Sequence, residues 1–395
     1  MREFSLFEGD PLSRFFLLFG IRSRGVSAFA GRFLFLLIVT FLPTAFFCLW
    51  SGFGPGKPRA LNFFADAAAL SQAFLGYPMF IIAEMVIGIK TRTTAKHFSE
   101  SGLVQPADLG ELDNIHEKIA QIRHRLAPDL VCLFLAFACS GLWLWEEVHN
   151  SYDTWHALGA PGVQSPTLAG WWVALVGIPI FNYWWLRWIW KVSIWCYYLR
   201  RVSKLDLRLI ASHPDMTGGL GFLSSTQGSF AILVFAFGIG IIAPLIGYKV
   251  DIENASLMSF SVGGPLVAFV IGAPLFFTLP LLFFTKRLSR VKKRAEDAYQ
   301  DRATEAALYF EKSWLTACSG DDCSNLLGSN LSAMNNLNQA YNHIKLMRVV
   351  PFDTRSFSQL TASTFGSLLP LLPKFFDIPE PVSQIIEALK PLFGK

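Results

Sequence analysis

The residues whose types and spacing could do chemistry gather in one short stretch, LDLRLIASHPDMTGGLGFLSSTQGS, at positions 205–229. His213 and Asp215 are separated by a proline, which restricts the residue before it to extended backbone and keeps the imidazole and the carboxyl group close together. A histidine beside a carboxylate can transfer a proton, and its own charge changes near neutral pH. Four basic residues precede the pair and complete a candidate ligand or gate site: Arg200, Arg201, Lys204 and Arg208.

The sequence leaves several functions of this stretch open. The basic residues could bind the phosphate of a lipid or a substrate, and His213 could gate an ion path by taking up a proton. The stretch could also be a structural turn, in which the glycines supply positive φ angles where the chain re-enters a bilayer. Catalysis on a lipid phosphate, with His213 and Asp215 as acid and base, is a weaker alternative because no further carboxylate or histidine cluster accompanies them. The glycines do not match a nucleotide-binding P-loop, since its Lys and Ser/Thr are missing.

The elements that must position these residues are membrane helices. The chain is 52% hydrophobic and only 16% charged, whereas soluble domains carry about 25% charged residues. Apolar runs close to the roughly 20 residues needed to cross a bilayer recur along the chain, at 33–50, 63–89, 130–145, 171–186, 230–248 and 265–284. We therefore predict an all-α membrane protein with six transmembrane helices.

The basic residues indicate how these helices are oriented. With the N-terminus in the cytoplasm, all but three of the 34 Lys and Arg residues lie on the inner side; the exceptions are Lys57, Arg59 and Lys249. Such an asymmetry is typical of cytoplasmic loops. The net charge of +5 is thus explained by membrane orientation, and we predict membrane lipids as partners and no nucleic acid.

The predicted order of segments follows from the spans. It is an N-terminal cytoplasmic or interfacial arm (1–32), transmembrane helices 1 and 2 (33–89), a cytoplasmic helical hairpin (90–127), transmembrane helices 3 and 4 (128–199), the His-Pro-Asp and glycine loop (200–229), transmembrane helices 5 and 6 (230–285), cytoplasmic helices (286–355) and a re-entrant or interfacial C-terminal segment (356–395). Residues 357–378 are an alternative seventh span. The cysteine pair Cys318 and Cys323 lacks a second pair, so we predict no metal and no cofactor.

Ionisable residues inside spans are costly and are treated as functional candidates. Asp66 and Glu84 are the acidic ones, and both lie close enough to a span end to need no partner. Arg187 and Lys191 are expected to reach the inner interface with their charged ends. Helix-breaking residues in the last two spans, on either side of the predicted outer loop 249–260, favour a path through the membrane; the path-lining candidates are Gly238, Gly240, Pro244, Gly272, Pro274 and Pro280.

Two motifs carry a resemblance. The loop LDLRLIASHPDMTGGLGFL and the tail NLNQAYNHIKLMRVVPFDTRSFSQLTASTFGSLLPLL resemble those of a family of bacterial polytopic inner-membrane proteins that has no assigned activity. The resemblance implies a bacterial inner-membrane protein in which these two inner segments pack together, and it implies no functional residues.

Three functions follow from these observations. The leading hypothesis is a homo-oligomeric channel or transporter for an ion or small solute. The alternatives are a membrane scaffold or sensor that recruits partners through its cytoplasmic helices, and a membrane-embedded enzyme that acts on a lipid phosphate.

Overall fold

The structure is a computed structural model that describes residues 4–7, 9–21, 25–149, 151–245, 260–317 and 323–369. The chain is mostly helical. Within the described residues, five helices are long and apolar enough to cross a membrane: Val26–Trp50, Ala68–Glu100, Ala127–Val148, Gly221–Ile241 and Gly263–Tyr309. The prediction of a mostly helical chain with several helices long and apolar enough to span a membrane is confirmed. A further long helix, 168–202, corresponds to the fourth predicted span and lies inside the bundle.

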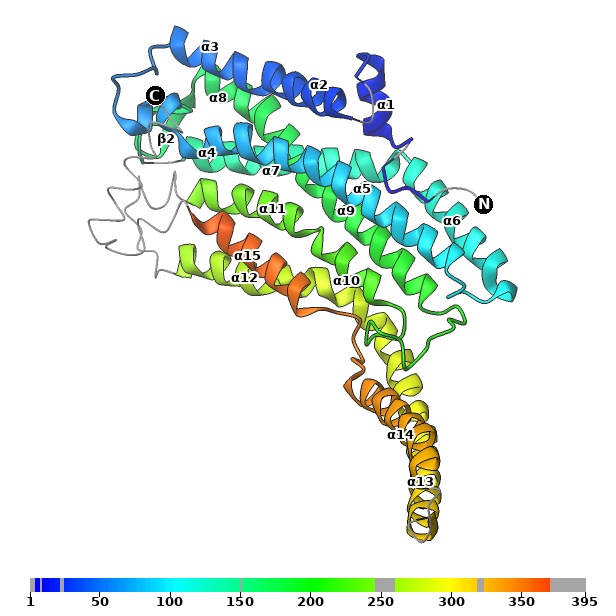
Figure 1. The fold of residues 1–395 in the computed structure, drawn as a ribbon. Coiled ribbons are helices and arrows are strands. Elements are labelled where there is room, and N and C mark those ends of the chain that lie inside the picture. The colour runs from blue at the N-terminus through cyan, green and yellow to red at the C-terminus, as the bar shows by residue number, and fades with distance from the viewer. Residues whose placement is uncertain are drawn as a thin grey trace, which may run out of the picture.

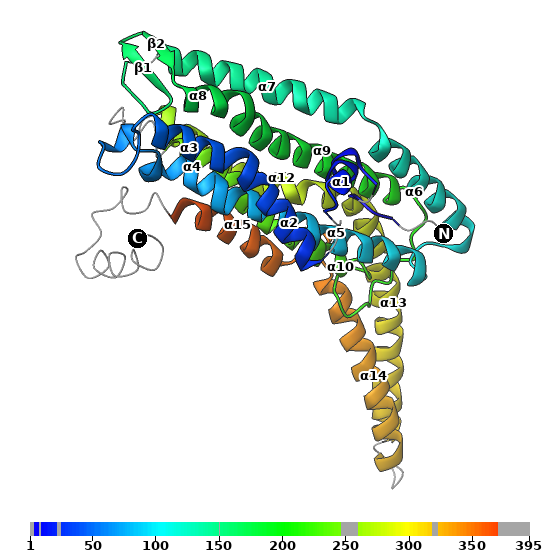
Figure 2. The same cartoon turned by 90° about the horizontal axis from the view of Figure 1, so that it is seen from above.

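The bundle is built from helices that run side by side (Figures 1 and 2). In chain order its elements are α1 (Pro11–Leu18), α2 (Val26–Leu36), α3 (Leu42–Trp50), α4 (Ala67–Ser71), α5 (Tyr77–Glu100), α6 (Leu109–His124), α7 (Ala127–Val148), α8 (Leu168–Trp172), α9 (Ile178–Val202), α10 (Gly221–Gly228), α11 (Ala231–Pro244), α12 (Phe260–Thr278) and α15 (Thr354–Leu368). Short 3₁₀ turns lie at Arg59–Leu61, Phe63–Ala65 and Pro106–Asp108, and a longer one, η8, at Leu279–Phe284. The two ends of the bundle differ: one carries a β-hairpin, and a pair of helices projects from the other.

One end carries a β-hairpin and is called the hairpin end. Strands β1 (Ala157–Ala160) and β2 (Val163–Pro166) pair antiparallel, with Ala160 opposite Val163 across a Pro-Gly turn. Gly162 has a φ of 82°, which a β-carbon would disfavour. The all-α prediction describes the rest of the described chain but did not include this hairpin, in which the Pro-Gly pair closes a two-residue turn between short extended segments.

The other end is called the rod end, because α13 (Thr285–Ala317) and α14 (Cys323–Leu346) form an antiparallel pair that projects away from the bundle (Figure 1). Helix α13 continues from α12 through η8, where Pro280 removes a backbone donor and tightens the turn. The chain then returns to the bundle as α15, which packs along α11 and α12. The predicted outer loop 249–260 lies outside the described residues except for Phe260, as do Cys318 and residues 370–395.

The outside of the bundle is apolar along whole helix faces. In the first span, the exposed large side chains recur every three or four residues, at Leu34, Ile38, Leu42, Phe46 and Leu49. A similar stripe on α12 and η8 comprises Val267, Ile271, Leu275, Leu279 and Leu282. Soluble monomers rarely expose apolar stripes of this length, which are typical of surfaces that contact a membrane or another protein.

Three turns that lie wholly within the described part of the bundle are π-helical, and each comes just before a proline. They are η1 (Leu37–Phe41), η4 (Gln72–Gly76) and η6 (Val173–Gly177), and Pro43, Pro78 and Pro179 follow two residues after each turn ends. A proline has no N–H group and its ring collides with the carbonyl four residues earlier, which a wider turn relieves. The carbonyl groups of Val39 and Ala174 inside these turns accept hydrogen bonds from Trp172 (3.2 Å) and Ser140 (2.5 Å).

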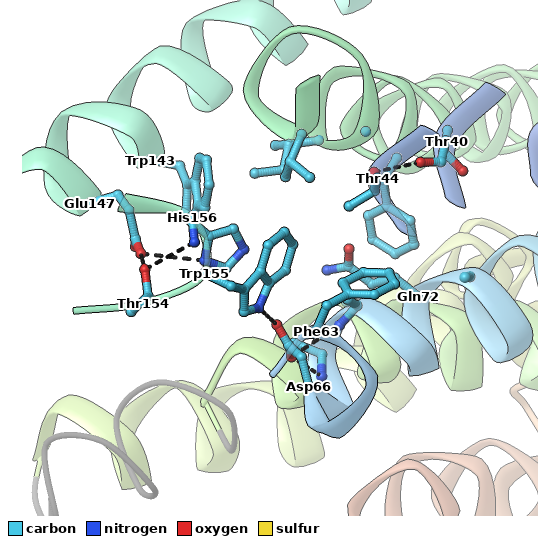
Figure 3. A pocket seen from close by; sticks show the side chains of 18 of the residues that line it. Thr40, Thr44, Phe63, Asp66, Gln72, Trp143, Glu147, Thr154, Trp155 and His156 are labelled. Carbon is cyan, nitrogen blue, oxygen red and sulfur yellow. Dashed lines mark hydrogen bonds and ion pairs between the residues drawn. The ribbon is translucent and has the colours of Figure 1, made fainter. Parts of the chain in front are cut away.

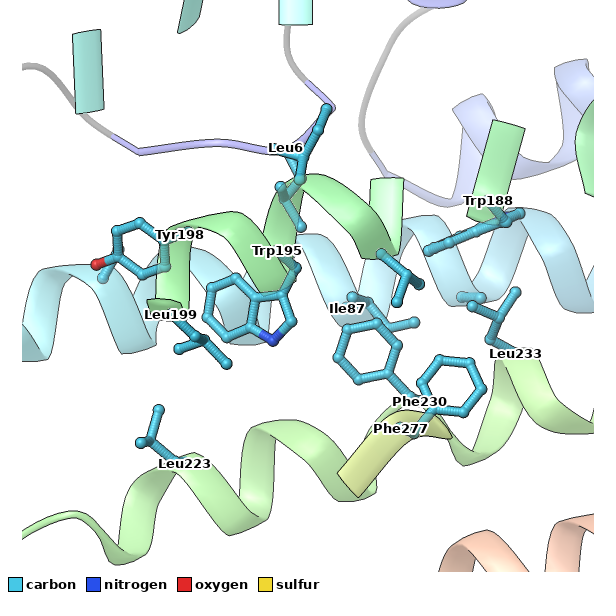
Figure 4. Packing of buried hydrophobic residues seen from close by; sticks show 14 of the residues in the cluster. Leu6, Ile87, Trp188, Trp195, Tyr198, Leu199, Leu223, Phe230, Leu233 and Phe277 are labelled. Atoms are coloured by element: carbon cyan, nitrogen blue, oxygen red, sulfur yellow. The ribbon is translucent and has the colours of Figure 1, made fainter. Parts of the chain in front are cut away.

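The core is rich in aromatic side chains and reaches from the bundle to the N-terminal arm, residues 4–21. Figure 4 shows Leu6 of the arm against α9, whose Trp188, Trp195 and Tyr198 face inward. Phe4 lies 4.5 Å from Tyr198 between ring centroids, and Phe7 lies 5.2 Å from Trp188. The arm is therefore part of the hydrophobic core at the rod end.

Candidate functional site

A cavity of about 910 Å³ opens at the hairpin end, between the five candidate spans and the helix 168–202. All three π-helical turns contribute to its wall, through Thr40 and Phe41, Gln72 and Ala73, and Val173 and Gly177. π-Helical turns in membrane helices often mark functional sites, because the widened turn displaces side chains and backbone from their regular positions. The volume is within the range of pockets for small molecules.

The wall of this cavity, called the outer cavity below, is acidic and aromatic. Its titratable side chains include four carboxylates and one histidine: Asp66, Glu146, Glu147, Asp153 and His156. Among the described residues that line it, there is no Lys and no Arg. Aromatic rings surround the acidic groups, namely Phe41, Phe63, Tyr77, Trp143, Tyr152, Trp155 and Phe181. Such a wall has a negative electrostatic potential and ring faces that attract positive charge.

Glu147 is the most deeply buried of these carboxylates, at 4% exposure. Its Oε1 accepts a hydrogen bond of 2.5 Å from the Thr154 hydroxyl and lies 3.3 Å from Nδ1 of His156 (Figure 3). The imidazole of His156 packs edge-on against Trp143, with ring centroids 5.1 Å apart. These contacts join the end of α7 to the loop before the hairpin and hold a carboxylate and an imidazole together in the wall.

Asp66 uses both carboxylate oxygens structurally. Oδ1 accepts from the backbone N–H groups of Ala68 and Ala69, at 2.8 and 3.2 Å, and so caps the start of α4. Oδ2 accepts from the indole N–H of Trp155 at 3.0 Å (Figure 3). Asp66 therefore links the second candidate span to the loop that covers the cavity.

The floor of the outer cavity is a layer of aromatic rings. Tyr77 and Phe181 line the cavity and touch each other with centroids 5.6 Å apart. Phe80 lies behind them, 5.7 Å from Phe181 and 6.3 Å from Trp184, and is fully buried. This layer separates the cavity from the rod end of the bundle.

A network of five buried charged residues lies beyond that layer, beneath the N-terminal arm. Glu84 accepts from Arg32 at 2.9 Å and from Arg187 at 3.4 Å. Asp10 of the arm pairs with Arg187 and, at 3.0 Å, with Lys191. The predictions that Glu84 needs no partner and that Arg187 and Lys191 reach the interface are wrong. All three are almost fully buried because the arm covers them.

The His-Pro-Asp loop lies at the rod end, away from the outer cavity. Nδ1 of His213 lies 2.8 Å from Oδ1 of Asp215, and the carboxylate also accepts from the backbone N–H groups of Thr217, Gly219 and Gly221. Burial acts to raise the pKa of Asp215, but these three backbone hydrogen bonds outweigh it and hold the pKa below its ordinary value. Asp215 thereby shapes the loop and the start of α10.

The same loop packs against the tail motif. The backbone N–H of Arg348 donates to the carbonyl of Met216 at 2.7 Å, and the backbone N–H of Asp353 donates to the Ser224 hydroxyl at 2.8 Å. Met216 has a positive φ of 53°. The two stretches that carry the resemblance therefore lie against each other in the structure.

The four predicted basic residues upstream of the loop do not lie together. Arg200 and Lys204 line a second, smaller groove at the rod end. Arg201 is instead paired with Glu111 of α6 at 3.0 Å. Arg208 is exposed, and its backbone N–H bonds to the carbonyl of Leu103 at 2.7 Å. The structure thus does not bring all six predicted ligand or gate residues to one point.

The predicted path-lining residues also have different positions. Gly240 lines the outer cavity, and Pro244 is the last residue of α11, one before the cavity-lining Leu245. A β-carbon on Gly238 would lie 2.4 Å from the β-carbon of Ser367, so this glycine permits close packing of α11 and α15. Gly272 is exposed on α12, where nothing lies within 4 Å of an added β-carbon. Pro274 inside α12 and Pro280 in η8 are buried.

Our sequence analysis did not predict the carboxylate and histidine that contact each other in the wall of the outer cavity. Glu147, Thr154 and His156 lie in a stretch that reads as a polar connection between spans. The available signal was a carboxylate at the end of an apolar run, followed within ten residues by a Thr-Trp-His triplet. Asn182 and Gln72, which also line the cavity, are amides within apolar runs and were a further signal.

Comparison with known proteins finds no family model, no curated protein and no solved structure that matches this chain.

Proposed function

We propose that the chain is a six-span protein of the bacterial inner membrane that transports a small, positively charged solute, with the outer cavity as its binding site. The helix 168–202 is the sixth span in this proposal. The rod end, which carries the projecting helices and most of the basic residues, lies in the cytoplasm with the N-terminus, as the distribution of basic residues favours. The outer cavity then opens to the periplasm.

The observation that carries the proposal is the composition of the cavity wall. A space of about 910 Å³ between membrane helices holds four carboxylates and no Lys or Arg among its described lining residues. Negative charge in a partly apolar cavity raises the local concentration of cations. Aromatic rings add a second attraction for cations that carry an apolar body, such as substituted ammonium ions.

The arrangement below the cavity supports a transporter rather than an open pore. The aromatic layer of Tyr77, Phe181 and Phe80 closes the floor, and the buried charge network and the arm close the rod end. Passage of a solute therefore requires these layers to rearrange. The proline-linked π-helical turns, which flank the cavity in three helices, supply backbone that lacks regular helical hydrogen bonds at the level where bending is needed.

A second function, recruitment of partners, is favoured by the rod of α13 and α14. The rod projects from the bundle (Figure 1), and Leu308 and Tyr309 on it are 62% and 67% exposed. An exposed helical pair of this kind could join a second copy of the chain, as the prediction of a homo-oligomer requires. Recruitment and transport are compatible, since the rod and the outer cavity lie at opposite ends.

The test is flux into liposomes that contain the purified protein. Sodium, potassium and tetramethylammonium are compared with chloride and acetate, under a gradient and under voltage. We expect cation flux that falls at least tenfold in Ala69→Trp, because Ala69 lines the cavity and the indole would fill it. Leu130→Trp is the matched control, since Leu130 is 61% exposed on the outside of α7. Unchanged flux in Ala69→Trp, or anion flux equal to cation flux, would contradict the proposal.

The sign of the charge is tested separately with Glu147→Gln. Glutamine keeps a side-chain oxygen for Thr154 but removes the negative charge, so the cation flux per folded protein should fall, with the amount of folded protein in each liposome sample measured separately because the contact with His156 is weakened. Glu100→Gln is the control, because Glu100 is 63% exposed and forms a surface pair with Lys96.

A further inference from the structure

A second groove, of about 400 Å³, lies at the rod end where α9 ends and α13 begins. It is called the basic groove and is lined by Arg200, Ser203, Lys204, Phe283, Lys286, Arg287 and Arg290. Five of these seven residues are basic, and none is acidic. They come from two parts of the chain that are about 80 residues apart in sequence, so their convergence is a property of the fold.

Most of these charges are not neutralised within the protein. Among the described residues, no carboxylate forms an ion pair with Arg200, Lys204, Lys286 or Arg290. Arg287 differs from them: its guanidinium donates to the backbone carbonyls of Lys204 and Leu205 and lies 3.8 Å from Asp206. Arg287 therefore holds the two sides of the groove together. The other four present like charges that repel one another unless an anion lies between them.

The groove adjoins apolar surface on its bundle side. Phe283, one of its lining residues, is 40% exposed. Leu279 and Leu282 precede it in η8 and are 54% and 49% exposed. These side chains continue the apolar stripe of α12, which faces lipid tails in a membrane. The groove thus lies where the apolar surface of the bundle meets the charged rod.

We propose that the basic groove binds the phosphate headgroup of an anionic phospholipid in the inner leaflet. The four unpaired basic side chains provide charge-assisted hydrogen bonds to phosphate oxygens, and Phe283, Leu279 and Leu282 contact the acyl chains of the same lipid. Basic pockets at this level of a membrane protein bind such headgroups. The adjoining apolar surface distinguishes a lipid from free phosphate, which would gain nothing from it. This site is independent of the transport function.

The experiment measures how far added lipid raises the thermal unfolding temperature of the full chain in detergent. The probes are phosphatidylglycerol, cardiolipin, phosphatidylcholine and inorganic phosphate. We expect saturable stabilisation by the two anionic lipids and little by phosphatidylcholine or phosphate. Equal stabilisation by inorganic phosphate would overturn the assignment to a lipid, and equal stabilisation by phosphatidylcholine would overturn the role of the basic residues.

The variant that tests the site carries Arg200→Gln, Lys204→Gln and Arg290→Gln, and leaves Arg287 intact so that the groove keeps its shape. Its apparent affinity for phosphatidylglycerol should fall at least tenfold. The matched control carries Lys118→Gln, Arg125→Gln and Lys293→Gln, which removes the same charge from exposed positions outside the groove. Equal loss in the control would show that binding depends only on overall charge and would overturn the proposal. Native mass spectrometry of both variants counts the retained lipids and provides a readout that does not depend on stability.

Discussion

Asp10 and Arg187 are 177 residues apart in sequence and form a fully buried ion pair, in which the carboxylate of the N-terminal arm meets the guanidinium at the centre of α9. Lys191 adds a second cation to the same carboxylate at 3.0 Å. Glu84 supplies the other anion to Arg187 and also pairs with Arg32. The network therefore holds three cations and two anions, and one of the anions comes from the arm. Without Asp10, a single carboxylate, that of Glu84, would remain for three buried basic groups.

Asp10→Asn should therefore destabilise the protein by about 3–5 kcal/mol, the usual cost of removing one partner of a buried ion pair. Asparagine caps helices as well as aspartate does, so the hydrogen bond to the backbone N–H of Ser13 can be kept and the loss isolates the charge. Thermal unfolding in detergent measures the effect. Glu100→Gln breaks an exposed pair and should cost less than about 1 kcal/mol. Equal costs in the two variants would mean that the buried pair contributes no more than a surface one.

The carboxylate of Asp215 should make the stability of the rod end depend on acidity. Its pKa is lowered in the folded state by backbone hydrogen bonds from Thr217, Gly219 and Gly221, in spite of burial. Because its pKa is lower in the folded state, the charged carboxylate stabilises the fold at pH values above the ordinary carboxyl pKa of about 3.9. This stabilisation is lost as the pH falls through the pKa of the folded state.

Asp215→Asn should therefore destabilise the protein by about 1–2 kcal/mol at pH 7, with a difference from the wild type that shrinks below pH 4. Glu305→Gln on the rod, where both members of its ion pair with Arg302 are exposed, should show neither effect. Thermal unfolding at pH 7 and at pH 3.5 provides the comparison. A difference that does not change with pH would contradict the role assigned to the charged form.

The parts of the fold that could be predicted depend on local pattern. The positions and lengths of the apolar runs predicted where the long apolar helices lie. In lipid, the backbone N–H and C=O groups of such a run must bond to one another, and a helix satisfies all of them within the run. The Pro-Gly pair at residues 161 and 162 is a turn signal that our prediction did not use, and its flanking strands are too short to show a pattern. The prolines at 43, 78 and 179 were not used in our prediction, and a proline alone does not indicate that the turn before it is π-helical.

The candidate site could not be predicted in the same way, because it depends on contacts between distant segments. Nothing near Glu84 in sequence indicates that Arg32 and Arg187 approach it. The closeness of Asp66 to Trp155 likewise follows from how a loop folds over a helix end. The His-Pro-Asp loop attracted attention because its residues can do chemistry, whereas the structure uses the carboxylate of Asp215 to bind three backbone N–H groups.

Gly238 and Gly272 offer a comparison between two glycines of the same membrane region. Gly238→Ala should destabilise the protein by about 1–3 kcal/mol, since the added β-carbon would lie 2.4 Å from the β-carbon of Ser367 and force α11 and α15 apart. Gly272→Ala should be neutral or slightly stabilising, because it meets nothing within 4 Å and alanine favours a helix. Thermal unfolding of the two variants tests this. A destabilised Gly272→Ala would indicate that α12 has a partner at that position.

His116 should make attachment of the N-terminal arm sensitive to pH. Its ring packs against both Phe4 of the arm and Tyr198 of α9, with centroids 5.6 and 5.8 Å away, and neither ring nitrogen has a hydrogen-bond partner among the described residues. Burial lowers its pKa, and the nearby Asp113 opposes this only in part. The neutral imidazole is therefore the form that the fold accepts. The contribution of His116 to stability is therefore complete at pH values above the ordinary histidine pKa of about 6.5. It is lost as the pH falls from there through the lower pKa of the folded state.

Acidification from pH 7.5 to pH 5 should accordingly increase hydrogen exchange in residues 4–7 and 9–19 of the wild type, after correction for the intrinsic rate at each pH. His116→Phe keeps an aromatic ring against Phe4 and Tyr198 but cannot take up a proton, so its arm should exchange equally slowly at both pH values. His343→Phe, at an exposed position on α14, should behave as the wild type does. If the arm of His116→Phe loosens on acidification as much as that of the wild type, the pH sensitivity arises elsewhere and the role assigned to His116 is overturned.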